Sequence, residues 1–319
     1  MFKLWFDEKL LPTCAHLLDG IAVGIGPSAT LDGIDQADAF ICPGNTKYDG
    51  ARMDKAPQLK VIARLGVGYD NISVPDATAH NIVVCYAPEA PMVSTAEHAL
   101  TLMLAVAKKI RPLDIAARKG QGYAHIEHLK GIELEGRTLG LVGVGRIGSR
   151  VAIACRALGM RVLGFDPYLS AARANELGIE LTSSLAALLV QSDVVSLHVP
   201  VTPETRNLMN AERFAQMKPG AVFINAARGA LVDEAALTDA LARGHLVGAG
   251  IDVYQKEPPE VGHPFSQFEN VVMTSHVASH TEAGHHRLYE TAIVQALQVL
   301  RGEKPQWILN PEVWERRRV

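Results

Sequence analysis

Apolar runs of strand length alternate along the chain with stretches whose apolar residues recur at every third or fourth position, as on one face of a helix. The first series of runs predicts strands at residues 3–6, 21–25, 39–41, 60–63 and 82–85. The second series predicts strands at residues 138–142, 161–165, 194–197, 221–224, 247–251 and 271–274. Strands that alternate with helices pair in parallel, so the pattern predicts an α/β protein with two doubly wound parallel sheets.

Two helical stretches lie where the chain is expected to pass between its two halves. A long helical pattern from about residue 95 to 119 follows Pro88 and Pro91, and we expect Pro112 to break or kink it. Residues 282–300 form the last large helical pattern, which should return the chain to the first half. A chain of 319 residues, 48% of them hydrophobic, is long enough for two such domains.

Charge and cysteine usage narrow the classes of partner. The formal net charge is −3 and the largest basic cluster is three arginines at 316–318, so no nucleic-acid partner is expected. The four scattered cysteines, without C-x-x-C spacing, indicate neither a zinc site nor disulfides and fit a reducing compartment. The first residues lack the apolar core of a signal peptide, and no uncharged apolar stretch has the length of a bilayer span. We therefore expect a cytoplasmic protein without a membrane partner.

A glycine-rich loop follows the predicted strand at 138–142 and precedes a helical pattern. Gly143 permits a tight turn, Gly145 lets the backbone approach a pyrophosphate, and Gly148 lets the helix pack closely on the strand. The free amides of Arg146 and Ile147 at the helix N-terminus would then face the phosphates. This context predicts a dinucleotide site, although the same glycines could form a turn that binds nothing.

Asp166 follows the next predicted strand, 18 positions after Gly148. A carboxylate at this place accepts hydrogen bonds from the adenosine ribose hydroxyls and repels a 2′-phosphate. Residues 167–169 include no Arg or Lys that would bind such a phosphate. The sequence therefore predicts NAD rather than NADP; the alternative is that Asp166 only caps a helix or a turn.

A second glycine pair, Gly66 and Gly68, flanks Val67 after an earlier predicted strand. Asn71 stands where the third glycine of a dinucleotide loop would be, so the close helix packing of such a loop is not prepared. Backbone amides at 66–68 are better suited to a smaller anion such as a carboxylate. The alternative is an ordinary turn.

Each of the last three predicted strands is followed by a residue able to take part in catalysis: Arg228, Glu257 and His276. The carboxyl ends of strands in an open parallel sheet line the ligand crevice, so we expect the three to converge beside the nicotinamide. A His can protonate the carbonyl oxygen of a 2-keto acid, and an Arg can hold its carboxylate with a bidentate fork. A Glu can orient the His and stabilise its charged form.

Each of these residues also has a structural interpretation. Arg228 could form a structural ion pair, and Glu257 could lie in a solvated loop. A group of histidines follows His276, but no cysteine or acidic ligand spacing accompanies it beyond Glu282. We therefore expect no metal site.

Four segments carry a resemblance to a known family: 134–148, 164–167, 225–234 and 252–259. Over almost its full length the chain resembles the D-isomer-specific 2-hydroxyacid dehydrogenases, most closely the catalytic regions of phosphoglycerate dehydrogenases. The resemblance implies that Arg228, Glu257 and His276 are the catalytic set, and that Asp252 contacts the nicotinamide carboxamide. It also implies contacts that line the cofactor, from Val67, Val199, Ala226 and Ala227. It further implies a carboxylate site for the substrate, formed by Gly66, Val67, Gly68 and Arg228.

The resemblance implies two Rossmann-like domains with a cleft between them. The flavodoxin-like substrate domain would comprise residues 1–92 and 287–319, and the NAD-binding domain residues 93–286. Family members of this kind usually form dimers or tetramers through the cofactor domain, so a homodimer or homotetramer is expected.

The function predicted from these features is NAD-dependent hydride transfer between nicotinamide and a small 2-hydroxy or 2-keto acid. Phosphoglycerate dehydrogenases typically carry an Arg-Ser pair in an R-S-x-T-K stretch, where this chain has Pro43 and Gly44. An alternative is still D-3-phosphoglycerate dehydrogenase, with another cation such as Lys47 holding the phosphate. A formate dehydrogenase is disfavoured, since that relative uses Gln where Glu257 stands. From another class, an NAD-sensing corepressor that binds peptides has the same fold.

Overall fold

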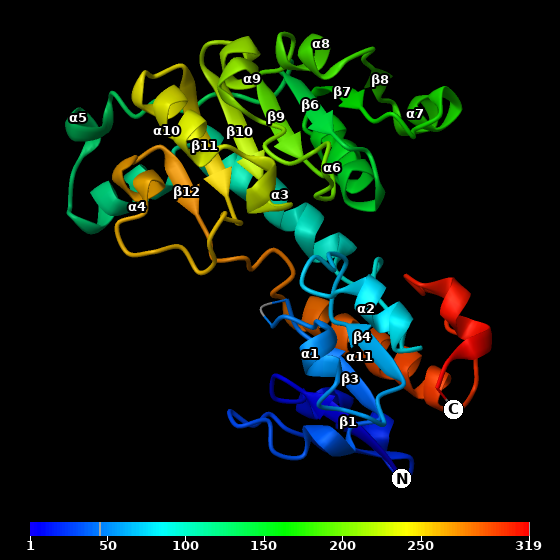
Figure 1. Cartoon of the computed structure of the whole chain (residues 1–319). Helices are drawn as coiled ribbons and strands as arrows, with labels where there is room; N and C mark the ends of the chain where they lie inside the picture. The colour runs from blue at the N-terminus through cyan, green and yellow to red at the C-terminus, as the bar shows by residue number, and fades with distance from the viewer. Residues whose placement is uncertain (45, 319) are drawn as a thin grey trace. The chain divides into compact units, whose positions relative to one another are not determined.

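The computed structural model describes residues 1–44 and 46–318, which form two compact units (Figure 1). Unit 1 combines Met1–Pro91 with His280–Val319, and unit 2 is the continuous segment Met92–Ser279. Residues 280–286, which the sequence analysis assigns to the second domain, group with unit 1. The reason is that they lead into and begin an unbroken helix, α11 (Glu282–Leu300), that packs within unit 1.

Unit 1 is built on five parallel strands in the order β2-β1-β3-β4-β5. The strands are β1 (Phe2–Phe6), β2 (Ala22–Ile25), β3 (Ala39–Cys42), β4 (Val61–Arg64) and β5 (Val83–Cys85). Alternate residues of a strand enter different cores: Ala39 and Ile41 face α11 and the 3-10 helix η1 (Pro12–Leu18), whereas Phe40 faces α1 (Gly50–Met53) and α2 (Val74–Ala79). Both faces of the sheet are therefore covered, as a parallel sheet requires.

Unit 2 contains seven parallel strands in the order β12-β11-β10-β9-β6-β7-β8. The strands are β6 (Thr138–Val142), β7 (Arg161–Phe165), β8 (Glu180–Leu181), β9 (Val194–Leu197), β10 (Ala221–Asn225), β11 (Leu246–Ile251) and β12 (Val271–Met273). One core lies between the sheet and α3 (Met92–Ala107) with α6 (Arg146–Ala157), and it receives Val222 and Ile224 of β10. The other core receives Phe223 and lies under three helices, α8 (Leu185–Leu189), α9 (Ala211–Gln216) and α10 (Glu234–Ala242).

The prediction of two doubly wound parallel sheets is confirmed, and every predicted strand is present. The two-residue strand β8 was not predicted. The expected break at Pro112 is wrong. The helical stretch is interrupted earlier, between the end of α3 at Ala107 and the start of α4 (Ile110–Arg118), where Lys109 has a left-handed φ of 56°. Pro112 is tolerated in the first turn of α4 because an amide there has no intrahelical partner.

Short helices complete the described chain: α5 (Tyr123–Ile126), α7 (Ala171–Leu177), η2 (Ile34–Gln36), η3 (Gly229–Leu231), η4 (Pro264–Gln267) and η5 (Pro311–Arg316). Among the described residues, no helix combines the length and the apolar character needed to span a membrane.

Candidate active site

The glycine-rich loop of unit 2 connects β6 to α6, as the sequence predicts. A side chain at Gly143 would place its Cβ 2.7 Å from the carbonyl oxygen of His198, and one at Gly148 would place it 2.4 Å from the carbonyl oxygen of Gly143. A Cβ at Gly145 would meet no described atom within 4 Å. The first and third glycines therefore allow the tight turn and the close helix, while the middle one leaves open backbone that a pyrophosphate can approach.

The surroundings of this loop suit an anion next to a ribose. Helix α6 begins with Arg146 and Ile147, and its N-cap residue, a glycine, provides no side chain that would cap its amides. Asp166 directly follows β7, and its two carboxylate oxygens accept hydrogen bonds from the amides of Val144 and Tyr168, each at 2.9 Å. A carboxylate offers about four acceptor positions, so Asp166 can stabilise the turn and still accept from ribose hydroxyls.

The three residues proposed for catalysis from the sequence lie in the segments that follow three neighbouring strands of unit 2. Arg228 follows β10, Glu257 follows β11, and His276 follows β12, and these strands are adjacent in the sheet. Oε2 of Glu257 lies 2.7 Å from Nδ1 of His276, which brings these two residues together as expected. The guanidinium of Arg228 donates to the carbonyl oxygen of Ala227 at 2.7 Å, and its charge contributes to lowering the pKa of Glu257.

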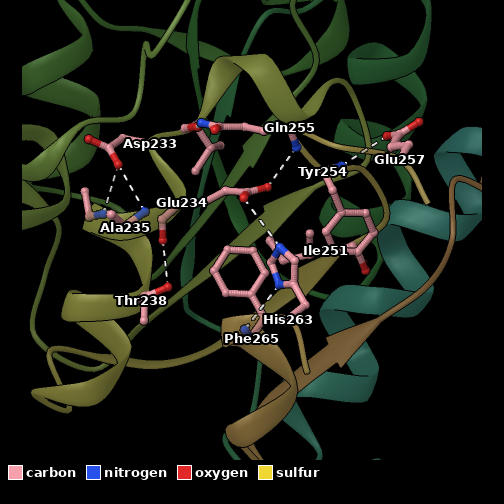
Figure 2. A network of polar contacts seen from close by, with 12 residues as sticks. Asp233, Glu234, Ala235, Thr238, Ile251, Tyr254, Gln255, Glu257, His263 and Phe265 are labelled. Atoms are coloured by element: carbon pink, nitrogen blue, oxygen red, sulfur yellow. Dashed lines mark hydrogen bonds and ion pairs between the residues drawn. The ribbon is translucent and has the colours of Figure 1, made fainter. Parts of the chain in front are cut away.

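The environment of Glu257 keeps it ionised. Burial raises the pKa of its carboxyl, but the hydrogen bond to His276, the amide of Tyr254 at 3.0 Å and the charge of Arg228 outweigh burial, so the pKa is lowered. Figure 2 shows the contact between this carboxylate and Tyr254. An ionised carboxylate can only accept a hydrogen bond, so Nδ1 of His276 carries a proton and Nε2 is the atom that can exchange one.

The loop that carries this glutamate is braced from neighbouring segments (Figure 2). The carboxylate of Glu234 accepts from the amide of Gln255 at 2.8 Å and lies 3.4 Å from Nε2 of His263. The ring of His263 meets the ring of Tyr254 edge-on, with centroids 5.2 Å apart. A Cβ at Gly229 would lie only 2.0 Å from the carbonyl group of Tyr254, so the loop after β11 packs directly on the loop after β10.

Asp252 is a fully buried carboxylate next to His276 in the fold. It accepts hydrogen bonds from the hydroxyl of Thr274 at 2.6 Å and from the amides of Val277 and Ala278 at 2.9 and 3.0 Å. Burial raises its pKa, but His98, Thr274 and the Val277 amide outweigh burial and lower the pKa to about 2. His98 and Thr274 were not identified from the sequence.

The other residues implied by the family resemblance in unit 2 lie around the same strand ends. A Cβ on Gly143 would lie 2.7 Å from Cγ1 of Val199, so Val199 packs on the glycine-rich loop. Ala226 is buried and Ala227 is half-buried directly after β10. The side chain of Asn225 fixes this segment: its oxygen accepts from the amide of Ala227 at 3.0 Å, and its nitrogen donates to the carbonyl oxygen of Arg228 at 2.9 Å.

The glycine pair of unit 1 follows β4 and lies over a buried arginine that was not identified from the sequence. Arg64 is 7% exposed, and its guanidinium donates to the carbonyl oxygens of Gly68 and Leu65 at 2.8 and 2.6 Å. The amide of Gly66 donates to the carbonyl oxygen of Arg64 at 2.9 Å. This places a positive charge beneath the loop and leaves the amides of Val67 and Gly68 as the candidates for binding an anion.

Comparisons with known proteins agree in matching the chain to dehydrogenases of 2-hydroxy acids and a related reductase. Residues 100–278 match the family model described as D-isomer specific 2-hydroxyacid dehydrogenase, NAD binding domain. The chain is 39% identical over 97% of its length to D-3-phosphoglycerate dehydrogenase of Methanocaldococcus jannaschii, but it spans only 60% of that protein. It is also 39% identical to glyoxylate reductase of Thermofilum pendens, covering 89% of this chain and 84% of the relative. The structure of Aquifex aeolicus D-lactate dehydrogenase with NAD and lactic acid matches with a TM-score of 0.83 and 30% identity, over 94% of this chain and 96% of that one.

Proposed function

Because the chain belongs to the family of D-isomer-specific 2-hydroxyacid dehydrogenases, we propose that it is an NAD-dependent enzyme that interconverts a small 2-keto acid and its D-2-hydroxy acid. Residues 100–278 match the NAD-binding domain of this family, which confirms the cofactor predicted from the sequence. The observation that carries the proposed activity is the 2.7 Å contact between Glu257 and His276, on strand ends next to that of Arg228. One edge of the sheet thus carries a proton donor (His276), its counter-charge (Glu257) and a cation for the substrate (Arg228).

The two units have different roles in this proposal. Unit 2 is the cofactor domain and unit 1 the substrate domain. The glycine-rich loop would hold the pyrophosphate and Asp166 the adenosine ribose. The side chain of Asp252, which the family resemblance places against the nicotinamide carboxamide, is fully buried and accepts from the amides of Val277 and Ala278, so we assign it to holding the loop of His276. NADH, when bound, supplies the hydride. Side chains and backbone that would line the cofactor come from Arg146, Ile147, Val67, Val199, Ala226 and Ala227.

The residues of unit 2 supply the proton and the charges. During reduction, Nε2 of His276 gives its proton to the carbonyl oxygen at C2 of the keto acid, and the imidazolium becomes neutral. Glu257 stabilises the imidazolium before the transfer. Arg228 binds the substrate carboxylate and polarises the neighbouring carbonyl group. During oxidation, neutral His276 takes the hydroxyl proton instead.

Unit 1 supports a small, unphosphorylated substrate. The amides of Val67 and Gly68, with the charge of Arg64 beneath them, provide a place for its carboxylate. At the stretch where phosphoglycerate dehydrogenases carry an Arg-Ser pair, this chain has Pro43 and Gly44. The guanidinium of Arg64 lies 3.0 Å from where a Cβ at position 44 would stand, so it takes the space that a side chain there would need.

A second candidate function is D-3-phosphoglycerate dehydrogenase, which is the name of relatives such as the Methanocaldococcus jannaschii protein. A panel of hydroxypyruvate, glyoxylate and phosphohydroxypyruvate, each with NADH and with NADPH, separates the two. We expect higher kcat/KM for an unphosphorylated acid, with NADH, and no turnover by a His276→Ala variant. A clear preference for phosphohydroxypyruvate would favour the second candidate. No turnover of any acid, with NADH still bound, would contradict both and favour an NAD-sensing binding protein.

We also propose a homodimer or homotetramer. Apolar side chains are exposed on α4 and α5: Ile110 (53% exposed), Ile115 (38%) and Tyr123 (75%). Covering them in an assembly would remove apolar surface from water. Light scattering on the purified protein tests this, and a monomer at micromolar concentration would contradict it. The cytoplasmic location stays a prediction.

A further inference from the structure

We infer that His98, on helix α3, is a positioning residue for the proposed reaction. It holds Thr274 and Asp252, and Asp252 fixes the loop that carries His276. The inference rests on the proposed function, because it concerns how the proton donor of that reaction is held in place.

His98 contacts both partners with one ring nitrogen. Its Nε2 lies 3.0 Å from Oγ1 of Thr274 and 3.4 Å from Oδ1 of Asp252, and its side chain is 18% exposed. A ring lone pair facing an ionised carboxylate would be repelled, so Nε2 carries a proton and donates. Oγ1 of Thr274 therefore accepts from His98 and directs its own proton to Asp252, at 2.6 Å. The imidazole thus fixes the direction of the Thr274 hydroxyl.

Asp252 passes this constraint to the loop after β12. Its backbone carbonyl accepts from the amide of His276 at 2.7 Å, and its two carboxylate oxygens accept from the amides of Val277 and Ala278. His276 has a left-handed φ of 54°, a conformation that a residue with a Cβ keeps only when its surroundings enforce it. Three consecutive amides that end on one residue are such surroundings.

A buried carboxylate in this position needs a partner that donates a hydrogen bond. The Asp252 side chain has no exposed surface, so water cannot replace a lost donor. Helix α3 is well placed to hold the donor, because it packs along β11, the strand that leads into Asp252. Loss of the His98 donor should therefore let Thr274 turn and the loop of His276 relax.

The test compares His98→Leu, which removes the donor, with His98→Gln, which keeps an N–H donor on a side chain of similar reach. His245→Leu is the matched control: its Nε2 lies 3.0 Å from the carbonyl oxygen of Phe214, and it precedes β11 at the end away from Asp252. With hydroxypyruvate and NADH, kcat of His98→Leu should fall by up to about tenfold, the upper end of what a hydrogen bond to a neutral hydroxyl contributes. His98→Gln should recover part of this loss, and His245→Leu should keep the wild-type kcat.

A double variant distinguishes positioning from general destabilisation. If His98 acts through Thr274, the losses in kcat of His98→Leu and Thr274→Val should be far from additive in the double variant. Additive losses, or a control variant as impaired as His98→Leu, would overturn the inference.

The third readout does not need turnover, so it separates this inference from the proposed function. The ring resonances of His276 in NMR spectra of the NADH complex should shift in His98→Leu and not in His245→Leu. Unchanged His276 resonances would overturn the positioning role even in an active enzyme. Failure of every keto acid to react, with the resonances shifted, would instead count against the proposed reaction alone.

Discussion

Replacing Glu257 with Gln keeps the shape of the side chain but cannot keep both of its contacts. In the folded protein Oε1 accepts from the amide of Tyr254 at 3.0 Å and Oε2 meets Nδ1 of His276 at 2.7 Å. A Gln side chain has one acceptor oxygen and one NH₂ donor. While Nδ1 of His276 carries a proton, one of the two N–H groups faces another donor whichever way the amide turns, and the charge opposite the imidazole is gone.

The expected size of the effect follows from these contacts. A hydrogen bond to a charged group contributes about 1.5–3 kcal/mol. If that stabilisation is lost in the protonated form of His276, kcat for keto-acid reduction should fall about ten- to a hundred-fold, at roughly 1.4 kcal/mol per factor of ten. KM for NADH should change little, because Glu257 is not among the residues proposed to hold the cofactor.

The pH dependence gives a second, independent readout. Reduction starts from protonated His276 and oxidation from neutral His276, so the loss of the counter-charge should affect the two directions differently. Initial rates in both directions across neutral pH measure this under conditions where chemistry limits the rate. A variant with wild-type kcat and an unmoved pH profile would refute the role of Glu257 in proton transfer.

Stability should depend on pH with a defined sign. Burial raises the pKa of Glu257, but the hydrogen bond to His276, the Tyr254 amide and the charges of His276 and Arg228 together outweigh burial, so the folded-state pKa is below the ordinary value of the carboxyl. Such a group contributes stability that is present above the unfolded-state pKa and is lost as the pH falls through the folded-state pKa. The difference in Tm between wild type and Glu257→Gln should therefore shrink on acidification. A difference that grows would contradict this assignment.

Three further substitutions test other parts of the site. Arg228→Lys should lower kcat/KM for the keto acid by about tenfold or more, because an ammonium cannot form the bidentate fork; wild-type kinetics would argue against the role. Asp166→Ala should raise KM for NADH and reduce the preference of the enzyme for NADH over NADPH. Equal use of both cofactors by the wild type would contradict the proposal that Asp166 selects NAD. Gly229→Ala should destabilise the protein by about 1–3 kcal/mol in urea unfolding, because its Cβ would lie 2.0 Å from the carbonyl group of Tyr254. An unfolding midpoint equal to that of the wild type would show that this contact relaxes freely.

The parts of the site that depend on local sequence could be predicted from it. The glycine-rich loop and Asp166 are each defined by a few residues next to an apolar strand, and the structure places them as expected. For Arg228 and His276 the sequence shows only that polar residues follow strands. That these strands are neighbours depends on the order β12-β11-β10, which hydrophobic periodicity does not contain.

The residues that were missed act through polar contacts that the pattern of hydrophobic residues does not describe. His98 lies in an apolar helical pattern, and its partner Thr274 is 176 positions away. Arg64 ends an apolar strand, and the nearby carbonyl groups that it binds leave no trace in the pattern of hydrophobic residues. Only the folded structure brings His98 and Thr274 together.

The two-part composition of unit 1 sets the order in which the protein can fold on the ribosome. Strands β1 to β5 are synthesised first, but the apolar residues of α11, among them Tyr289, Ile293 and Leu297, reach their sheet only after all of unit 2 has been made. At a synthesis rate of about 5–20 residues per second, roughly ten to forty seconds pass between the synthesis of β5 and that of α11, which covers one face of this sheet. Unit 2, being continuous, can complete its core in the meantime. The sheet whose strands are made first is thus the one whose core is completed last.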